Sequence, residues 1–186
     1  YSALSGWLEI RGCLRSGRTF SGRRHNRIRS ASTFSALECT AGSAKRAAES
    51  TRPDLTVESF EGETYGDWTT TGTAFGKGPI LVSDVPPYQG DLGATGTRVV
   101  NSHASAHGES TAGKDGAVGT LTSPPFTVER KYINVLVGGG GHAGRTCVNV
   151  RIGEKVVGSV TGDNNNSMRW KSIALDAHEG EQATIE

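Results

Sequence analysis

From Leu55 onward, short apolar stretches alternate with polar, glycine-rich turns, and this pattern predicts a domain built from short β-strands. The clearest period of two runs over 148–152, where valine and isoleucine alternate with polar residues. A Gly153-Glu154 turn follows, and 155–160 is predicted to return as the second strand of a hairpin. Similar patterns predict further strands at 55–60, 68–74, 80–82, 98–101, 118–122, 126–129, 131–137, 168–175 and 182–185. Many short strands separated by turn signals favour an all-β sandwich.

Four consecutive glycines, Gly138 to Gly141, follow the predicted strand at 131–137. With the residues up to Thr146 they approximate two nucleotide-binding motifs, G-x-x-x-x-G-K-[ST] and G-x-G-x-x-G. Both motifs require a helix after the glycines, because the helix N-terminus holds the phosphate. The residues after this loop have the period of a strand instead. We therefore interpret the glycines as a connection between two strands, where the backbone adopts positive φ or approaches another segment closely.

Residues 1–54 have a different composition. Seven arginines lie between Arg11 and Arg29, the only nearby acid is Glu9, and no helical or strand period is sustained. Such a segment is typical of a targeting presequence, of a basic tail that binds nucleic acid or an anionic surface, or of an unstructured extension, linker or non-coding sequence. We favour the unstructured extension, because so few apolar residues cannot offset the entropy of ordering. A short helix is predicted over 41–50, and the β domain is expected to occupy 55–186.

Charge and cysteine content limit the partners. The formal net charge is +1, so no overall field favours nucleic acid, and no apolar run is long enough to span a bilayer. Of the three cysteines, Cys147 lies in a predicted strand and is expected to be a buried free thiol. A disulfide between Cys13 and Cys39 rests on the count alone.

Catalytic and metal chemistry find only weak support. Three loop histidines are candidate zinc ligands, but no nearby cysteine completes the set: His103, His107 and His142. A Ser-His-Asp hydrolase would be expected to show the G-x-S-x-G motif, which the chain lacks. Two acidic pairs have the residue type of a glycosidase site, although solvated turn acids are the favoured interpretation: Glu61 with Asp67, and Glu109 with Asp115.

Two bulky aromatic residues of the domain, Trp68 and Trp170, are expected to pack in the core. An exposed tryptophan or tyrosine would instead offer a stacking surface to the apolar face of a sugar ring. Polar loop side chains of the type that bonds sugar hydroxyls are also present: Asp67, Asn101, Glu109, His142 and Arg145.

A series of short motifs follows in a characteristic order: Phe60-Glu61-Gly62, Tyr65-Gly66-Asp67-Trp68, Gly72-Thr73-Ala74-Phe75-Gly76, Val100-Asn101-Ser102, Tyr132-Ile133-Asn134, the glycine run with His142, Thr146-Cys147-Val148-Asn149 and Trp170-Lys171-Ser172. Over 55–186 this series resembles the β-sandwich accessory module attached to levanase- and invertase-type fructan hydrolases. Similar modules occur in bacterial surface proteins. The family pattern continues into one more strand, so the resemblance also implies a domain truncated at its C-terminus.

The resemblance implies a non-catalytic, jelly-roll-like sandwich that binds fructan outside the cell or in the periplasm, beside a catalytic domain that this sequence lacks. A structural calcium ion held by Glu61 is implied as well, and no other cofactor is expected. The predicted carbohydrate-binding residues are Asp67, Trp68, His103, Glu109, His142 and Arg145. Two alternatives stay open: a structural or protein-interaction domain of a larger surface protein, and, as the weakest, a small hydrolase or nucleotide enzyme.

Overall fold

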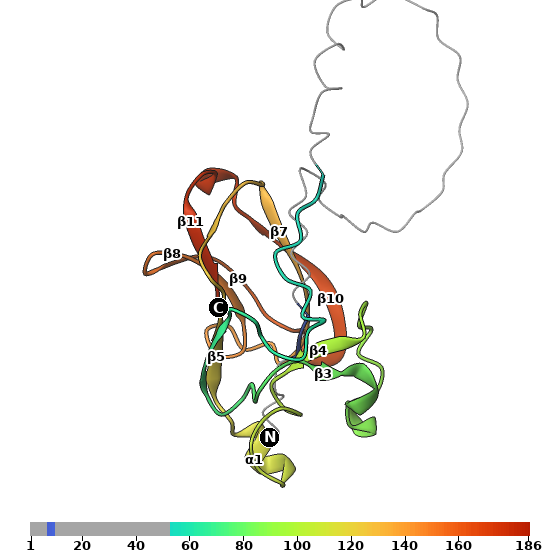
Figure 1. The fold of residues 1–186 in the computed structure, drawn as a ribbon. Helices are drawn as coiled ribbons and strands as arrows, with labels where there is room; N and C mark the ends of the chain where they lie inside the picture. Colours follow the sequence, from blue (N-terminus) through green and yellow to red (C-terminus); the bar gives the residue numbers. More distant parts are fainter. Residues whose placement is uncertain (1–6, 10–52) are drawn as a thin grey trace, which may run out of the picture.

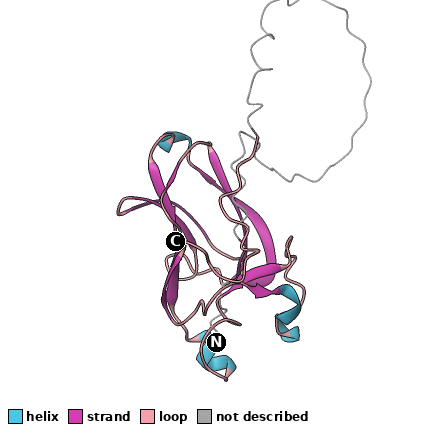
Figure 2. Ribbon diagram, viewed as in Figure 1, coloured by secondary structure: helices cyan, strands magenta, loops and turns pink. Residues whose placement is uncertain are grey.

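The computed structural model describes residues 7–9 and 53–186. In this part of the chain strands dominate, as Figure 2 shows, and the prediction of an all-β domain is confirmed. The strands are β1 (Trp7–Glu9), β2 (Thr69–Gly72), β3 (Ile80–Leu81), β4 (Arg98–Asn101), β5 (Gly119–Thr122), β6 (Phe126–Thr127), β7 (Tyr132–Gly139), β8 (Val148–Ile152), β9 (Lys155–Val160), β10 (Asn165–Ala174) and β11 (Gln182–Ile185). Helical turns are short: α1 (Thr111–Asp115), η1 (Val82–Asp84), η2 (Pro87–Gln89) and η3 (Asp176–His178). None of these described helices has the length and apolar character that crossing a bilayer would need.

The described strands form antiparallel sheets that share a core. A five-stranded sheet has the order β10-β7-β1-β4-β3, a four-stranded sheet has the order β6-β11-β8-β9, and β2 pairs with β5. Figure 1 shows β7 and β10 side by side, with β8, β9 and β11 across from them. Side chains from both larger sheets meet in the main apolar cluster, including Val135 of β7, Val150 of β8 and Ile185 of β11.

The strand β7 of the five-stranded sheet contributes apolar residues to clusters on both faces of the sheet. Along β7, Ile133, Val135 and Val137 point into the main cluster. Leu136, which lies between them, points to the opposite face and packs with Leu92, Val99 and Met168 under the segment 80–94. Burial on both faces explains why β7 is apolar from Val135 to Val137, whereas β8 alternates apolar with polar residues.

The glycine run connects two strands, as the period of the following residues predicted. β7 extends through Gly139, whose φ is 89°, and β8 and β9 form the expected hairpin with a turn at Gly153. A Cβ atom on Gly138 would lie 2.9 Å from the carbonyl oxygen of Asn166, so the backbones approach too closely for a side chain. The close approach and the positive φ account for two of the glycines.

Some predicted elements were wrong in detail. No strand forms over 55–60, where Phe60 adopts a φ of 55° and packs into the core together with Leu55 and Val57. The loop 102–116 ends in helix α1, which Ser110 caps by accepting a hydrogen bond from the Gly113 amide. Cys147 is a free thiol but is only half-buried.

The N-terminal predictions are largely untested, because the helix expected over 41–50 and the Cys13–Cys39 pair lie outside the described residues. The composition of 1–54 predicted no strand. The structure nevertheless places residues 7–9 as β1 between β4 and β7, with Trp7 opposite both Asn101 and Gly138. A three-residue strand is too short to show a period in the sequence.

Candidate functional site

Several loops emerge at one end of the five-stranded sheet. β4 and β7 both run antiparallel to β1, so their carboxyl ends lie on the same side, where Asn101 and Gly138 flank Trp7. β10 begins at this end, because Asn165 pairs with Gly139. The loop 102–116, the loop 140–147 and the start of β10 therefore lie close together.

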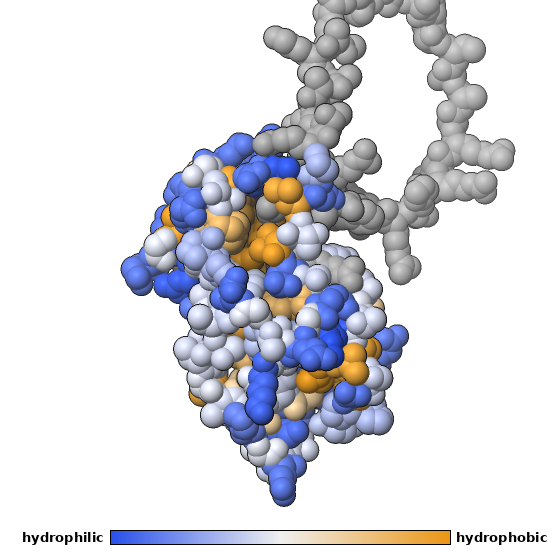
Figure 3. Space-filling model, in the orientation of Figure 1, coloured by the Kyte–Doolittle hydropathy of each residue, from blue (hydrophilic) through white to orange (hydrophobic). Residues whose placement is uncertain are grey.

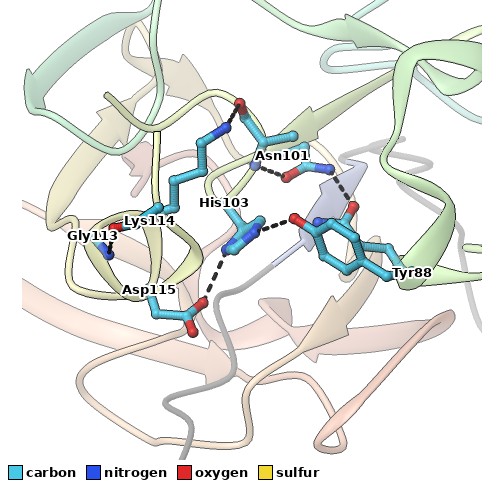
Figure 4. Close-up of polar contacts among 9 residues, drawn as sticks. Tyr88, Asn101, His103, Gly113, Lys114 and Asp115 are labelled. Carbon is cyan, nitrogen blue, oxygen red and sulfur yellow. Dashed lines mark hydrogen bonds and ion pairs between the residues drawn. The ribbon is translucent and has the colours of Figure 1, made fainter. Parts of the chain in front are cut away.

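A triad of hydrogen-bonded side chains, Tyr88, His103 and Asp115, lies among these loops. His103 is buried, with 3% of its surface exposed. Its Nδ1 atom lies 2.9 Å from Asp115 Oδ1, and its Nε2 atom lies 2.7 Å from the Tyr88 hydroxyl oxygen (Figure 4). The tyrosine comes from η2, the histidine from the turn after β4, and the aspartate from the end of α1.

The hydrogen-bonding chemistry of the three side chains determines which atom donates and which accepts in each contact. A carboxylate can only accept hydrogen bonds, so His103 carries a hydrogen on Nδ1 and donates it to Asp115. In the neutral imidazole Nε2 is then an acceptor, and the Tyr88 hydroxyl donates to it. The triad thus anchors the hydroxyl end of Tyr88 through a buried histidine.

Buried amides hold the backbone around the triad. Asn101 Nδ2 donates to Gln89 Oε1 at 3.3 Å, and Asn101 Oδ1 accepts from the Ala104 amide at 2.6 Å. Asn166 Nδ2 donates to the Gln89 carbonyl oxygen at 2.9 Å, which ties the Tyr88 turn to the start of β10. The Gln89 Nε2 atom is buried and makes no hydrogen bond within the described residues. It is a spare donor next to Tyr88.

The Tyr88 ring itself is presented to solvent. The residue is 64% exposed, and its ring meets the imidazole of His103 edge to face, with ring centres 5.9 Å apart. Pro86 and Pro87 precede it, and proline fixes φ, so the backbone at this turn loses little further freedom when a ligand binds. An exposed, pre-positioned aromatic ring can stack on the apolar face of a sugar.

Four predicted carbohydrate-binding residues lie at this end of the sheet. His103 belongs to the triad, and Glu109 is exposed in the same loop, before α1. His142 and Arg145 are exposed in a tight turn after the glycine run, where the His142 carbonyl oxygen accepts from the Arg145 and Thr146 amides at 3.0 and 2.9 Å. The loops thus bring basic and acidic side chains to the side of the molecule that carries Tyr88.

Two other predicted residues lie elsewhere. Asp67 is exposed in the turn that precedes β2, whereas the loop 102–116 meets the far end of β2, where the His107 amide donates to the Thr73 carbonyl oxygen at 3.3 Å. Trp68 is only 8% exposed and contacts Phe60, with ring centres 5.0 Å apart. Trp68 therefore has the core role that was favoured for it and offers little ring surface to a ligand. The same expectation was wrong for Trp170, which is 49% exposed on β10.

The predicted metal ligands are engaged in other contacts. The Glu61 carboxylate accepts hydrogen bonds from the Thr97 amide at 3.0 Å and the Thr97 hydroxyl at 2.5 Å. His103, a candidate zinc ligand, uses both ring nitrogens in the triad. Among the residues that the structure describes, no group of three or more His, Cys, Asp or Glu side chains gathers as a metal site would require.

Sequence reasoning did not single out Tyr88, and it treated Asp115 as a solvated acid. The available signal was an aromatic residue directly after Pro86-Pro87 in a polar loop. Prolines stiffen a loop, and an aromatic side chain in a stiffened surface loop is a candidate contact residue.

Replacing Asp115 with alanine is expected to lower the free energy of unfolding by about 2 kcal/mol, because the buried Nδ1–H of His103 loses its carboxylate acceptor. Urea denaturation measures the change. Glu109→Ala removes an exposed carboxylate from the same loop and serves as the control, with an expected change below about 0.5 kcal/mol. Equal effects of the two substitutions would show that the triad does not stabilise the loop.

Comparison with known proteins adds one relative. The chain is 30% identical over 135 residues to the Aspergillus rugulosus protein named "Putative glycosyl hydrolase ecdE". The match covers 71% of this chain but 18% of the relative, so the chain spans less than a fifth of that protein's length. No protein-family model matches the chain, and no solved structure matches it significantly. The chain is therefore related in sequence to a segment of a protein named as a glycosyl hydrolase.

Proposed function

We propose that this domain is a non-catalytic carbohydrate-binding module with a jelly-roll-like sandwich fold. Its ligand would be a levan-type fructan or a related glycan, and it would work outside the cell or in the periplasm, as part of a larger glycoside hydrolase or surface protein. The observation that carries the proposal is the exposed ring of Tyr88, which is anchored by a buried histidine and surrounded by polar loops. The similarity to a segment of a protein named as a glycosyl hydrolase supports a role connected with glycans.

In this proposal the ring and the loops have separate roles. Tyr88 supplies the apolar stacking surface, and its flat side chain loses little conformational entropy on binding. His142, Arg145 and Glu109 are exposed on loops at the same end of the sheet and supply donors and acceptors for hydroxyl groups. Asp67 would contact a longer glycan only near the beginning of β2. A calcium ion at Glu61 is not required by this arrangement.

Exposed aromatic residues favour sugar binding over the alternative of a purely structural domain. A structural module without a sugar site was expected to lack exposed aromatic rings on any concave face; Tyr88 is 64% and Trp170 is 49% exposed, so aromatic ring surface is available to a ligand. Trp170 lies on β10 opposite Leu136, on the face of the five-stranded sheet that packs beneath the segment 80–94. The surface seen in Figure 3 is mainly polar with small apolar areas, which suits a ligand rich in hydroxyl groups.

Calorimetric titration of the full chain with levan, inulin and fructose tests this function, with cellulose and xylan as comparison glycans. Tyr88→Ala is expected to weaken binding at least about tenfold, because loss of a stacked ring removes about 1.4 kcal/mol or more. Tyr88→Phe keeps the ring and is expected to lose only a few-fold in affinity. Val156→Ala, an exposed residue on β9 of the other sheet, is the matched control and should bind like the native chain. A folded chain that gives no heat with any of these glycans would rule the proposal out.

A further inference from the structure

The short strand β1 has an unusual position in the fold. It occupies the centre of the five-stranded sheet and pairs with β7 on one side and with β4 on the other. Residues 10–52 separate it in the sequence from the rest of the described domain. A central place in a sheet is thus filled by a segment that is remote along the chain.

The slot between β4 and β7 has a defined chemical character. Its middle position lies opposite Val100 and Val137, which are 0% and 5% exposed and belong to the main apolar cluster. The first position, which Trp7 occupies, lies between Asn101 and Gly138. The third position, which Glu9 occupies, lies opposite Leu136. The register therefore calls for an antiparallel strand with an apolar residue at the middle position, and the chain supplies Leu8 there.

Without a strand between β4 and β7, the folded domain would lose free energy of stabilisation. The edges of β4 and β7 that face β1 would keep unpaired N–H and C=O groups next to buried side chains such as Val100 and Leu136. Any strand with the same register satisfies these groups equally well, whichever molecule supplies it. The choice between the chain's own strand and another strand then depends on effective concentration alone, which is on the order of millimolar for a short linker and falls as the linker lengthens.

We propose that the slot between β4 and β7 is a strand-exchange site, in which the Trp7–Glu9 strand of a second copy of this chain can replace the chain's own strand. Residues 10–52 lie between β1 and the rest of the described domain in the sequence, and a chain of that length can span the distance to a neighbouring molecule. The two copies then exchange identical strands and form a closed dimer without any new interface. This inference goes beyond glycan binding and does not depend on it.

The test is to refold the full chain from denaturant at protein concentrations from about 10 μM to about 1 mM, the range that brackets the expected effective concentration. Chromatography with light scattering then measures the dimer fraction, which is expected to rise with concentration. Leu8→Pro removes a backbone donor from the middle of β1 and should abolish the dimer. Ala3→Pro places the same substitution outside β1 and should dimerise like the native chain.

A synthetic peptide of residues 5–12 keeps the test decisive if the Leu8→Pro chain folds poorly. The labelled peptide is expected to bind that variant in a fluorescence anisotropy titration and to raise its Tm, whereas a peptide with Asp in place of Leu8 should not. A native chain that stays monomeric at every concentration would overturn the proposal. So would a dimer that persists in Leu8→Pro, or a Leu8→Pro chain that the peptide neither binds nor stabilises.

Discussion

Replacing Phe60 with alanine is expected to lower the free energy of unfolding by about 3–5 kcal/mol. Phe60 is 2% exposed and contacts the rings of Tyr65 and Trp68, with ring centres 6.1 and 5.0 Å away. Alanine would remove the apolar transfer energy and both edge-to-face contacts, and it would leave a cavity that backbone turns on either side cannot fill. Urea denaturation followed by tryptophan fluorescence measures the change, because Trp68 is one of the contacting rings.

Phe126→Ala is the matched control for this prediction. Phe126 belongs to the short strand β6, and it packs against the same cluster but is only partly buried. The same change of side chain should therefore cost clearly less there, about 1–2 kcal/mol. If both variants lost equal stability, the aromatic cluster around Phe60 would not be the anchor that holds residues 53–68 on the core.

Replacing Gly162 with alanine is expected to destabilise the domain by about 3 kcal/mol and to displace the glycine loop. A Cβ atom at this position would lie 2.3 Å from the Gly139 carbonyl oxygen and 2.7 Å from the Gly138 carbonyl carbon. These neighbours are backbone atoms of β7, which cannot rotate away as a side chain would. Chemical denaturation measures the loss of stability, and amide NMR shifts of residues 138–146 report the displacement.

The control for Gly162 is Gly153→Ala in the β8–β9 turn. Gly153 has a φ of 54°, and a Cβ atom there would have no neighbour within 4 Å. Its replacement carries only the backbone cost of a positive φ, about 1 kcal/mol. If Gly162→Ala cost no more than Gly153→Ala, the close packing of 162 on β7 would be refuted. Weakened glycan binding in Gly162→Ala alone would also connect the glycine loop, with His142 and Arg145, to the ligand.

The elements that depend on local pattern could be predicted from the sequence. The β8–β9 hairpin, the apolar strand β7 and the glycine connection all show their character within a few consecutive residues. The segment 55–60 was predicted as a strand because its apolar residues alternate. Its course is instead set by the positive φ of Phe60 and by packing against rings that come later in the chain. Tertiary contacts outweigh local preference in such a segment.

The candidate site could be predicted only in part, for a related reason. His103 and the exposed pair His142 and Arg145 were chosen by residue type, and the topology brings their loops to one end of the sheet. Tyr88 and Asp115 become partners of His103 only because η2 and α1 fold over the end of β4. No spacing in the sequence encodes that contact, and the same holds for the pairing of β1 with strands far along the chain.

The central place of β1 also affects how the domain is synthesised. β1 leaves the ribosome before β4 and long before β7. In the folded sheet it lies between these two strands. At roughly 5–20 residues per second, translation needs about 7–26 seconds to extend from residue 9 to residue 139, and only later does β10 add the next strand of the sheet. During that interval the edge of β1 that pairs with β7 has no partner strand. A chaperone that shields apolar strand edges would therefore be most useful to this domain before translation reaches the glycine run.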